Sequence, residues 1–389
     1  MRIQKIPKLF QINTKSDLKD VKYLILGLSN IKGIGNKTVK AILDNCHFDV
    51  RRFLDLSDHD IRQTLLETKV PNYKDVLENI SKDKNELIQK GKEMLEKLEK
   101  QDIHLLLRDE LPEKMKTIPD PPYWLFIQGN RDIIYDGTFI AVVGTRNPTE
   151  KGKRAVELII DILSNYPVKI ISGLAKGIDE WVHEISLSKS LPNVAFLGCG
   201  IKKIFPSSTV HLRKKIVQYG GAVISEYLPY ETYEKYKFIR RNRLQAALAD
   251  LVIPVQAKEK SGTAHTVNYA KRYNKLIVGF LMDENNSIKN ILSTSDCLLV
   301  DIFKKEGRMQ LDKLVQNLLQ QRKVSFDVLA NIKKTLNKEL YSRYISEDKL
   351  QELINFINDV WKSRKDTLTQ TRALDAEGNN TEPKGNLPQ

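Results

Sequence analysis

Five polar turns in the middle of the chain combine glycine with hydroxyl, acidic or basic side chains. They are Gly144-Thr145-Arg146, Ser172-Gly173-Leu174-Ala175-Lys176-Gly177, Gly198-Cys199-Gly200, Ser225-Glu226 and Ser261-Gly262-Thr263. Glycine lets the backbone approach a phosphate closely, and the N-terminus of a following helix favours negative charge. A basic side chain such as Arg146 or Lys176 would neutralise that phosphate. The alternative is that some of these glycines serve only the turn from strand to helix.

Aromatic and basic residues alternate between Tyr233 and Arg243. The candidate contacts in this segment are Lys237, Phe238, Arg240, Arg241 and Arg243. Such a mixture is typical of surfaces that hold single-stranded nucleic acid, because cations bind phosphates and rings stack on bases. The alternative is a solvated basic helix start with Phe238 in the core.

A second phosphate-binding candidate is the turn around Gly33 and Gly35. Lys32 and Lys37 flank these glycines, Lys40 adds charge, and an apolar helix face follows. Two glycines before a helix are typical of a helix-hairpin-helix, which grips the nucleic-acid backbone through its N–H groups. The alternative is a turn between helices whose glycines serve packing.

Motifs of several enzyme classes are missing from the sequence. No GxGxxG follows the first predicted strand, and no GxxxxGK[ST], HExxH or GxSxG occurs. We therefore expect no catalytic residue, no cofactor and no metal site. His183 follows Asp179 at helical spacing and could pair with it, although an ordinary structural hydrogen bond is the simpler interpretation.

Short apolar runs precede the polar turns and predict the elements that position them. Six runs are expected to be strands: Phe139–Val143, Val168–Ile171, Val194–Leu197, Ala222–Ile224, Leu251–Val255 and Leu276–Val278. Helix-length amphipathic stretches separate them, which predicts an α/β fold with a doubly wound, mostly parallel sheet. The carboxyl ends of parallel strands share one edge of a sheet, so the turns should meet there.

The rest of the chain is predicted to be mainly helical. Residues 1–100 are expected to form a small helical domain with the hairpin, its last stretch, Ser81 to Lys100, being an exposed connector. Prolines 112, 119, 121 and 122 predict an extended segment before the α/β core, which should span 101–302. Residues 303–365 are expected to be helical and basic, and 366–389 a disordered polar tail.

Charge and composition point to a polyanionic partner. Among the 389 residues, 63 are Lys or Arg and 49 are Asp or Glu, a net charge of +14. Residues 201–275 concentrate this excess, with 15 basic against 5 acidic residues. Three distant cysteines predict no disulfide framework, and no apolar run predicts a signal peptide or a membrane span. We therefore expect a cytoplasmic protein.

The turns and the basic segment together resemble the DNA-processing protein A (DprA/Smf) family. The matching elements, in order, are Pro119-Asp120-Pro121-Pro122, Val142 to Arg146, Ile171 to Asp179 with His183, Phe196 to Ile201, Gly221 to Tyr227, Arg241-Asn242-Arg243 and Ser261-Gly262-Thr263. They cover about residues 101–280. The resemblance does not extend to a winged helix in 303–365.

The resemblance implies an extended Rossmann-like domain that binds single-stranded DNA and dimerises. It also implies a recombination mediator that protects incoming strands and helps to load a RecA-type recombinase during natural transformation. By motif, Arg146 and Lys176 would contact the strand, and Arg240, Arg241 and Arg243 would line the same basic surface. Gly173 and Gly177 would supply backbone donors.

Two other functions remain open from the sequence. Related Rossmann-like folds include phosphoribohydrolases, in which Glu226 or Asp179 would have to act as the acid. The PGGxGTxxE signature of those enzymes does not occur, since residues 260–266 read KSGTAHT. The remaining alternative is a nucleotide-sensing domain, which a small nucleotide should stabilise.

Overall fold

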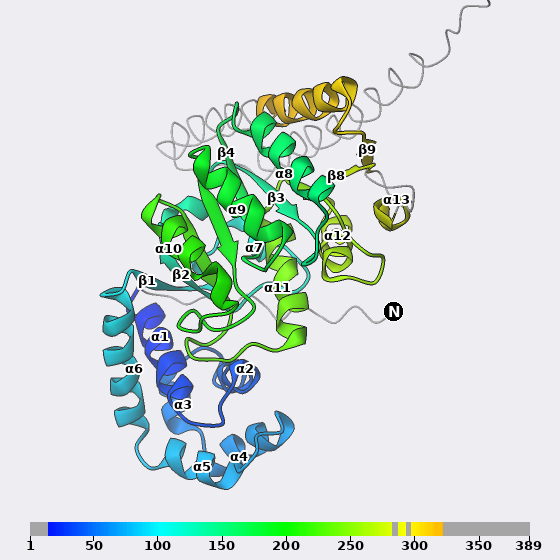
Figure 1. Cartoon of the computed structure of the whole chain (residues 1–389). Helices are drawn as coiled ribbons and strands as arrows, with labels where there is room; N and C mark the ends of the chain where they lie inside the picture. The colour runs from blue at the N-terminus through cyan, green and yellow to red at the C-terminus, as the bar shows by residue number, and fades with distance from the viewer. Residues whose placement is uncertain (1–14, 282–286, 293–296, 322–389) are drawn as a thin grey trace, which may run out of the picture. The chain divides into compact units, whose positions relative to one another are not determined.

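Nine strands form a mixed sheet in the computed structural model, which describes residues 15–281, 287–292 and 297–321 (Figure 1). The strands are β1 (Ile103–Leu107), β2 (Trp124–Gly129), β3 (Thr138–Val143), β4 (Val168–Ser172), β5 (Asn193–Phe196), β6 (Ala222–Ser225), β7 (Leu251–Pro254), β8 (Leu276–Phe280) and β9 (Leu298–Val300). Their order is β1-β2-β6-β5-β4-β3-β7-β8-β9. The six predicted strands are confirmed, and they run parallel.

Strands β1, β2 and β9 were not predicted. β2 pairs antiparallel with both β1 and β6, so the chain after the helical region adds an antiparallel edge to the parallel sheet. β9 extends the other edge by pairing parallel with β8. The sheet is therefore larger than the six apolar runs indicated.

Helices cover both faces of the sheet, as expected for a doubly wound fold. On one face lie α8 (Glu150–Leu163), α9 (Ile178–Ser188) and α10 (Val210–Gln218); on the other lie α7 (Glu113–Lys116), α11 (Lys235–Leu248), α12 (Gly262–Arg272) and α13 (Ser287–Leu292). Strand β3 is buried at every position, because its alternating side chains enter the cores on both faces. The fold is thus the predicted α/β class.

Helices also fill the N-terminal region. They are α1 (Lys15–Ser29), α2 (Asn36–Asn45), α3 (Val50–Asp55), α4 (Asp58–Glu67), α5 (Tyr73–Ser81) and α6 (Lys84–Glu99). Apolar side chains of these helices share one core with Trp124 and Phe126 of β2. The proposed boundary near residue 100 falls between α6 and β1 and stays a prediction.

The prediction that residues 81–100 form an exposed connector is wrong. Helix α6 packs along α1 and buries Leu87, Met94, Leu95 and Leu98. The contact is very close, because a Cβ placed on Gly91 would lie 1.8 Å from the Tyr23 carbonyl oxygen. The Lys and Glu pairs that suggested a fully solvated helix occupy only its outer side.

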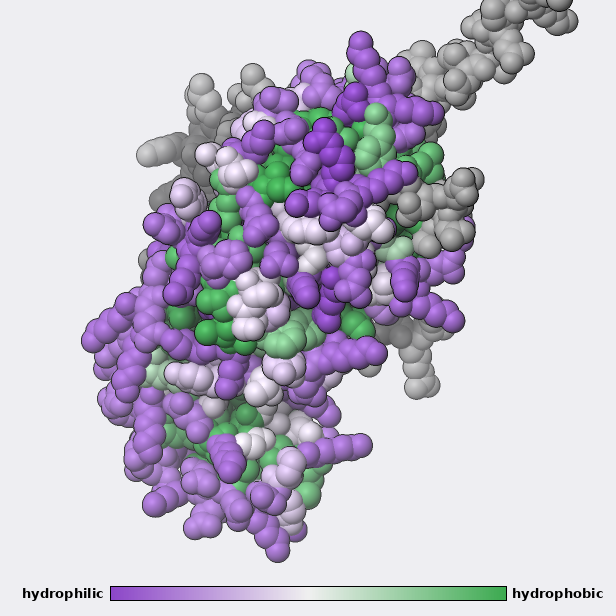
Figure 2. Space-filling view, in the orientation of Figure 1, coloured by the Kyte–Doolittle hydropathy of each residue, from purple (hydrophilic) through white to green (hydrophobic). Residues whose placement is uncertain are grey.

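The described C-terminal part is also helical. Residues 305–321 form a helix, from which Leu311 and Val315 enter the core beside α8 and α9. The predictions for 322–365 and for the tail 366–389 lie outside the described residues. Within the described residues, no helix is long and apolar enough to cross a membrane. Hydrophilic residues cover most of the face seen in Figure 2, with small apolar patches between them.

Candidate nucleic-acid interface

Three of the predicted turns meet at the carboxyl edge of the parallel strands. The Thr145 N–H donates to the Gln256 carbonyl at 2.7 Å, which joins the loops after β3 and β7. The Ile178 N–H donates to the Thr145 carbonyl at 3.1 Å, which adds the loop after β4. Strand order reverses between β3 and β7, and ligands of open α/β sheets bind at such a switch point.

Most glycines of these turns are required by packing within the protein. A Cβ on Gly144 would lie 2.5 Å from the Ile178 side chain, and one on Gly198 would lie 2.4 Å from the Phe238 ring. Gly177 has a φ of +91°, and its Cα faces the carbonyls of Thr145 and Arg146. We had expected such glycines to open the backbone to a phosphate, but protein atoms occupy that space.

Gly173 shows the same effect most clearly. A Cβ at this position would lie 2.0 Å from Nη1 of Arg241 and 2.5 Å from Oδ2 of Asp179. The glycine therefore makes room for a buried guanidinium and carboxylate. Gly262 differs, because it is exposed and a Cβ there would meet a described atom only at 4.0 Å.

The predicted hydroxyl residues are engaged in local structure. Ser172 is buried and donates to the Val142 carbonyl at 2.7 Å. The Ser261 side chain caps α12 by accepting from the Ala264 N–H, and Thr263 is buried in the first turn of that helix. These hydroxyls hold the edge in shape and are not directed at an open surface.

Three basic residues of α11 are buried, contrary to the prediction that the basic segment lines a surface. Lys237 is 2% exposed and forms ion pairs with Glu231 and Glu234. Arg241 donates to the Phe196 carbonyl at 2.7 Å and lies beside Asp179, and Arg243 is 0% exposed. Each cation has an acidic neighbour or a carbonyl partner inside the protein.

Arg243 belongs to an ion network, which we call the buried ion network and define as Lys40, Asp120, Glu226 and Arg243; Asp120 is its outer, partly exposed member. Glu226 accepts from Lys40 at 2.7 Å and from Arg243 at 2.8 Å, while Arg243 also pairs with Asp120 at 3.0 Å. Burial by itself would raise the pKa of Glu226, but Lys40 and Arg243 outweigh it and lower the pKa to about 2. Lys40, which we had assigned to the hairpin charge, therefore joins the helical region to the sheet edge.

Four predicted residues remain available at the edge, and we call Arg146, Lys176, Phe238 and Arg240 the platform. Arg146, Lys176 and Arg240 are exposed, and among the described residues none of them has an ion pair. The Arg146 guanidinium lies over the Phe238 ring, 5.1 Å from its centroid. Phe238 is only partly buried, so neither of its two predicted placements, surface or core, describes it fully.

Two aromatic residues extend the platform and were not among the predicted site residues. Phe205 lies 5.4 Å from Phe238 between ring centroids and stacks on Tyr233 at 3.8 Å. Phe205 reaches this place because the loop after β5 is bonded to the loop after β6, with the Gly200 N–H donating to the Glu231 carbonyl at 2.8 Å. An aromatic residue in a loop after a predicted strand was the signal that could have identified it.

The hairpin residues form the turn between α1 and α2. Lys32, Gly33 and Lys37 are exposed and Gly35 is half-buried. Gly33 has a φ of +98°, which favours glycine, and a Cβ on Gly35 would meet no described atom within 4 Å. The backbone before α2 is thus open to a ligand, as a phosphate grip requires.

The acidic residues considered for catalysis have structural partners. Glu226 belongs to the ion network, and Asp179 is 7% exposed beside Arg241. His183 bonds to Asn193 at 2.7 Å and not to Asp179. Among the described residues, no group of three His, Cys, Asp or Glu could hold a metal ion.

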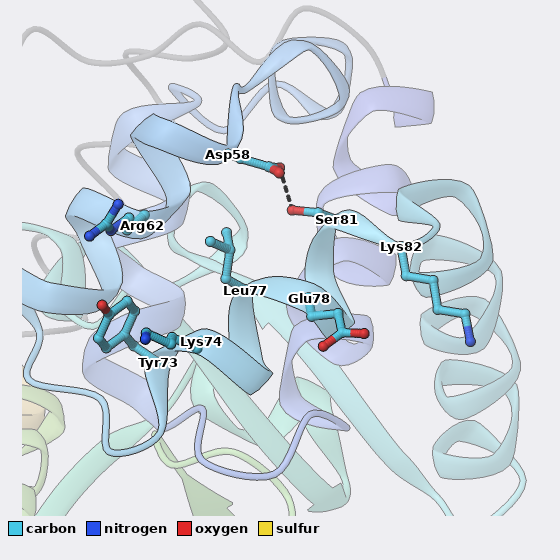
Figure 3. A pocket seen from close by; sticks show the side chains of 8 residues that line it. All are labelled: Asp58, Arg62, Tyr73, Lys74, Leu77, Glu78, Ser81 and Lys82. Atoms are coloured by element: carbon cyan, nitrogen blue, oxygen red, sulfur yellow. Dashed lines mark hydrogen bonds between the residues drawn. The ribbon is translucent and has the colours of Figure 1, made fainter.

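A shallow cavity lies elsewhere, between α4 and α5 (Figure 3). Its lining mixes charges of both signs, including Arg62, Lys74 and Glu78, and Asp58 accepts a hydrogen bond from Ser81. It shares no residue with the platform.

Comparisons with known proteins agree with this fold. Residues 102–293 match the family model of DNA recombination-mediator protein A. The DNA processing protein DprA of Bacillus subtilis is 34% identical over 161 residues, which is 41% of this chain and 54% of that protein. DprA of Streptococcus pneumoniae is 37% identical over 168 residues, 42% of this chain and 57% of that protein. The chain thus spans little more than half the length of these relatives.

Two solved structures are similar. DNA processing protein A from Helicobacter pylori has 27% identity and a TM-score of 0.50, covering 55% of this chain and 96% of that one. DprA from Streptococcus pneumoniae has 25% identity and a TM-score of 0.55, covering 72% of this chain and 94% of that one. Residues 102–293 of this chain are thus similar to the DNA-processing protein A (DprA/Smf) family in both sequence and fold.

Proposed function

We propose that this protein binds single-stranded DNA at the platform and acts as a DNA-processing protein, not as an enzyme. The observation that carries the proposal is the exposed guanidinium of Arg146 over the Phe238 ring, next to the switch point of the sheet and at one end of a row of aromatic rings. Lys176, in the loop after β4, and Arg240, two residues after Phe238, are also exposed and have no ion pair among the described residues. Cations bind a backbone of either form, but aromatic rings stack only on bases that are unpaired. This combination favours single strands over duplex.

The relatives support the proposal. The Helicobacter pylori structure is described as showing a single-stranded DNA binding mode of DNA processing protein A. The platform residues all lie inside the region that matches the family model. The basic residues of α11 that the structure buries are left out of the proposed contact set.

The direct test is fluorescence anisotropy with single- and double-stranded oligonucleotides of the same sequence over a salt series. We expect tighter binding of the single strand and an affinity that falls steeply with salt. Arg146→Gln should weaken binding, whereas Lys214→Gln on the exposed side of α10 serves as the charge-matched control. Lack of single-strand binding at low salt, or a preference for duplex, would overturn the proposal.

We further propose that the hairpin residues Lys32, Gly33, Gly35 and Lys37 grip the nucleic-acid backbone at a second position. This second proposal is supported by the glycine turn, whose backbone is open to a ligand, and by the two exposed lysines beside it. Loss of the hairpin charge should weaken binding without changing the preference for single strands, because the hairpin contacts no bases.

The name of the family supports a role in recombination. We propose that the protein is a cytoplasmic homodimer that delivers the bound strand to a RecA-type recombinase during natural transformation. Light scattering tests the dimer, and the rate of RecA filament assembly on protein-coated strands tests the delivery. A monomer, or unchanged assembly rates, would contradict these two proposals separately.

A further inference from the structure

Four side chains form a continuous row beside the sheet edge. Tyr233 stacks on Phe205 with a centroid distance of 3.8 Å and an interplanar angle of 23°. Phe205 is tilted by 45° against Phe238 at 5.4 Å, and Arg146 lies over Phe238. The row therefore begins with a cation and ends with a tyrosine.

The inner ring of this row is already surrounded by protein. The Phe238 ring contacts Gly198 so closely that a Cβ there would lie within 3 Å of three ring atoms. Phe205 and Arg146 occupy further sides of the same ring. A base would have to displace Arg146 or lie on top of its guanidinium to reach this part of the row.

The outer ring is in a different position. Tyr233 is 51% exposed, although Phe205 covers one of its faces. Phe205 thereby holds the Tyr233 ring in a fixed orientation before any ligand binds. A half-exposed aromatic ring with a rigid backing can accept a flat partner at a low entropic cost.

The acidic residues near Tyr233 are paired, whereas Lys235, two residues along the chain, is an exposed cation. The acidic residues are Glu231 and Glu234, and both pair with the buried Lys237. The exposed guanidinium of Arg146 lies at the other end of the row, over Phe238. This distribution offers the exposed cations Arg146 and Lys235 to the strand's phosphates and leaves the half-exposed Tyr233 ring for an uncharged, flat group.

We propose that Tyr233, backed by Phe205, is a base-stacking residue that takes a further unpaired base of the strand bound at the platform. The proposal rests on the proposed function and names its substrate class more closely: a strand that presents an intact base beyond the platform. A backbone that lacks this base should lose the contact. Purines should gain more than pyrimidines, since their stacking is stronger.

The test compares Tyr233→Ser, Tyr233→Phe and the control Tyr219→Ser on full-length protein, since Tyr219 is also exposed, at 65%, and lies at the end of α10. Single strands with and without abasic sites are titrated by anisotropy. A 2-aminopurine reporter base measures stacking through its fluorescence. Thermal unfolding of each variant checks that it is folded.

We expect Tyr233→Ser to weaken binding of intact strands by roughly 5- to 150-fold, the range for loss of one stacked base. Tyr233→Phe and Tyr219→Ser should bind as the original protein does. Abasic strands should bind the original protein and Tyr233→Ser equally, because the contact is then missing in both. Quenching of 2-aminopurine should fall in Tyr233→Ser alone.

Two results separate the inference from the proposed function. If the original protein binds single strands but Tyr233→Ser binds intact strands equally well with the same quenching, Tyr233 is not a stacking residue. If the original protein binds no single strand, the proposed function fails and the inference fails with it. Should Tyr233→Ser not fold, equal affinity of the original protein for intact and fully abasic strands would overturn the inference, while single-strand binding itself would still stand.

Discussion

Arg240 and Arg243 lie within one turn of α11, and their guanidiniums are in opposite situations. Arg240 is exposed and has no ion pair among the described residues. Arg243 is fully buried and pairs with Glu226 and Asp120. Helix α11 thus supplies one arginine to the platform and another to the buried ion network.

The comparison teaches that position on the helix decides what a basic residue can do. Residues three apart lie on nearly the same side of a helix, so rotation does not separate Arg240 from Arg243. Their place along α11 does, because the helix is buried from Arg241 to Leu248, whereas before Arg241 only Lys237 is buried. A buried cation needs a partner and stabilises the fold only together with it. An exposed cation contributes little to stability and is free to bind a phosphate.

The largest expected effect comes from breaking the ion network at its centre. Glu226→Gln removes the carboxylate that Lys40 and Arg243 share and leaves Arg243 with Asp120 alone, which should lower the free energy of unfolding by roughly 3–5 kcal/mol. Urea unfolding followed by circular dichroism measures this. Glu150→Gln, at an exposed position in the first turn of α8, is the control, and a loss below about 1 kcal/mol for Glu226→Gln would contradict the role of the network.

A pH effect of similar size should arise at His183. Burial lowers its pKa from 6.5 to about 4, although the hydrogen bond with Asn193 opposes the shift. Between these values the unfolded chain binds a proton that the folded protein does not, so stability should fall as pH decreases from 6.5 to 4, by about 1.4 kcal/mol per unit. The ion pairs of Glu226 affect stability over a lower pH range. Their stabilisation is complete above the unfolded pKa of Glu226, 4.5, and is lost as pH falls towards 2.

His183→Gln distinguishes the two pH ranges. The variant should lose the stability slope between pH 6.5 and 4 relative to the original protein, and keep the loss below pH 4.5. Unfolding titrations at several pH values measure both slopes. Identical slopes above pH 4.5 would show that His183 is not a buried neutral group.

Removing the Phe238 ring from the platform should affect DNA binding more than folding. Phe238→Leu keeps an apolar side chain against Gly198 but removes the ring under Arg146. We expect a loss of about 1 kcal/mol in single-strand binding. Anisotropy with single and double strands is the measurement, and an equal loss for both forms would indicate that the ring only supports the backbone contact.

The smallest effect should come from the hairpin. Lys37→Gln removes one exposed charge and should lower the salt slope of duplex binding by about 0.9, with thermal stability unchanged. Lys92→Gln on the exposed side of α6 provides the matched control. If the salt slope of Lys37→Gln equals that of Lys92→Gln, Lys37 does not contact the DNA.

The sequence predicted those parts of the fold that depend on local patterns. The six parallel strands were recognised because both of their faces are apolar, as in β3. β1 and β2 were missed because a proline-rich segment separates them and hides their pairing. The burial of α6 was missed because its close contact depends on Gly27 and Gly91, which lie far apart in sequence.

The sequence predicted that the loops after the strands lie together, but not which of their side chains are exposed. The turns after the strands were expected to meet at one edge, because that follows from parallel topology, and three of these loops are joined there by hydrogen bonds. Whether Arg240 or Arg241 is exposed depends on Asp179 and Phe196, which only the folded chain brings to Arg241. Likewise, the partners of Lys40 and Arg243 come from distant segments, so charge counting alone overestimated the basic surface.

The salt dependence of single-strand binding by a Lys176→Gln/Arg240→Gln double variant tests the central claim most directly. If the exposed cations bind phosphates while the buried ones stabilise the fold, the slope of log affinity against log salt should decrease by about 1.4, since each phosphate contact on a single strand contributes about 0.7. The unfolding temperature should stay that of the original protein. An unchanged slope in the folded double variant would contradict the claim that the platform is the DNA-binding surface.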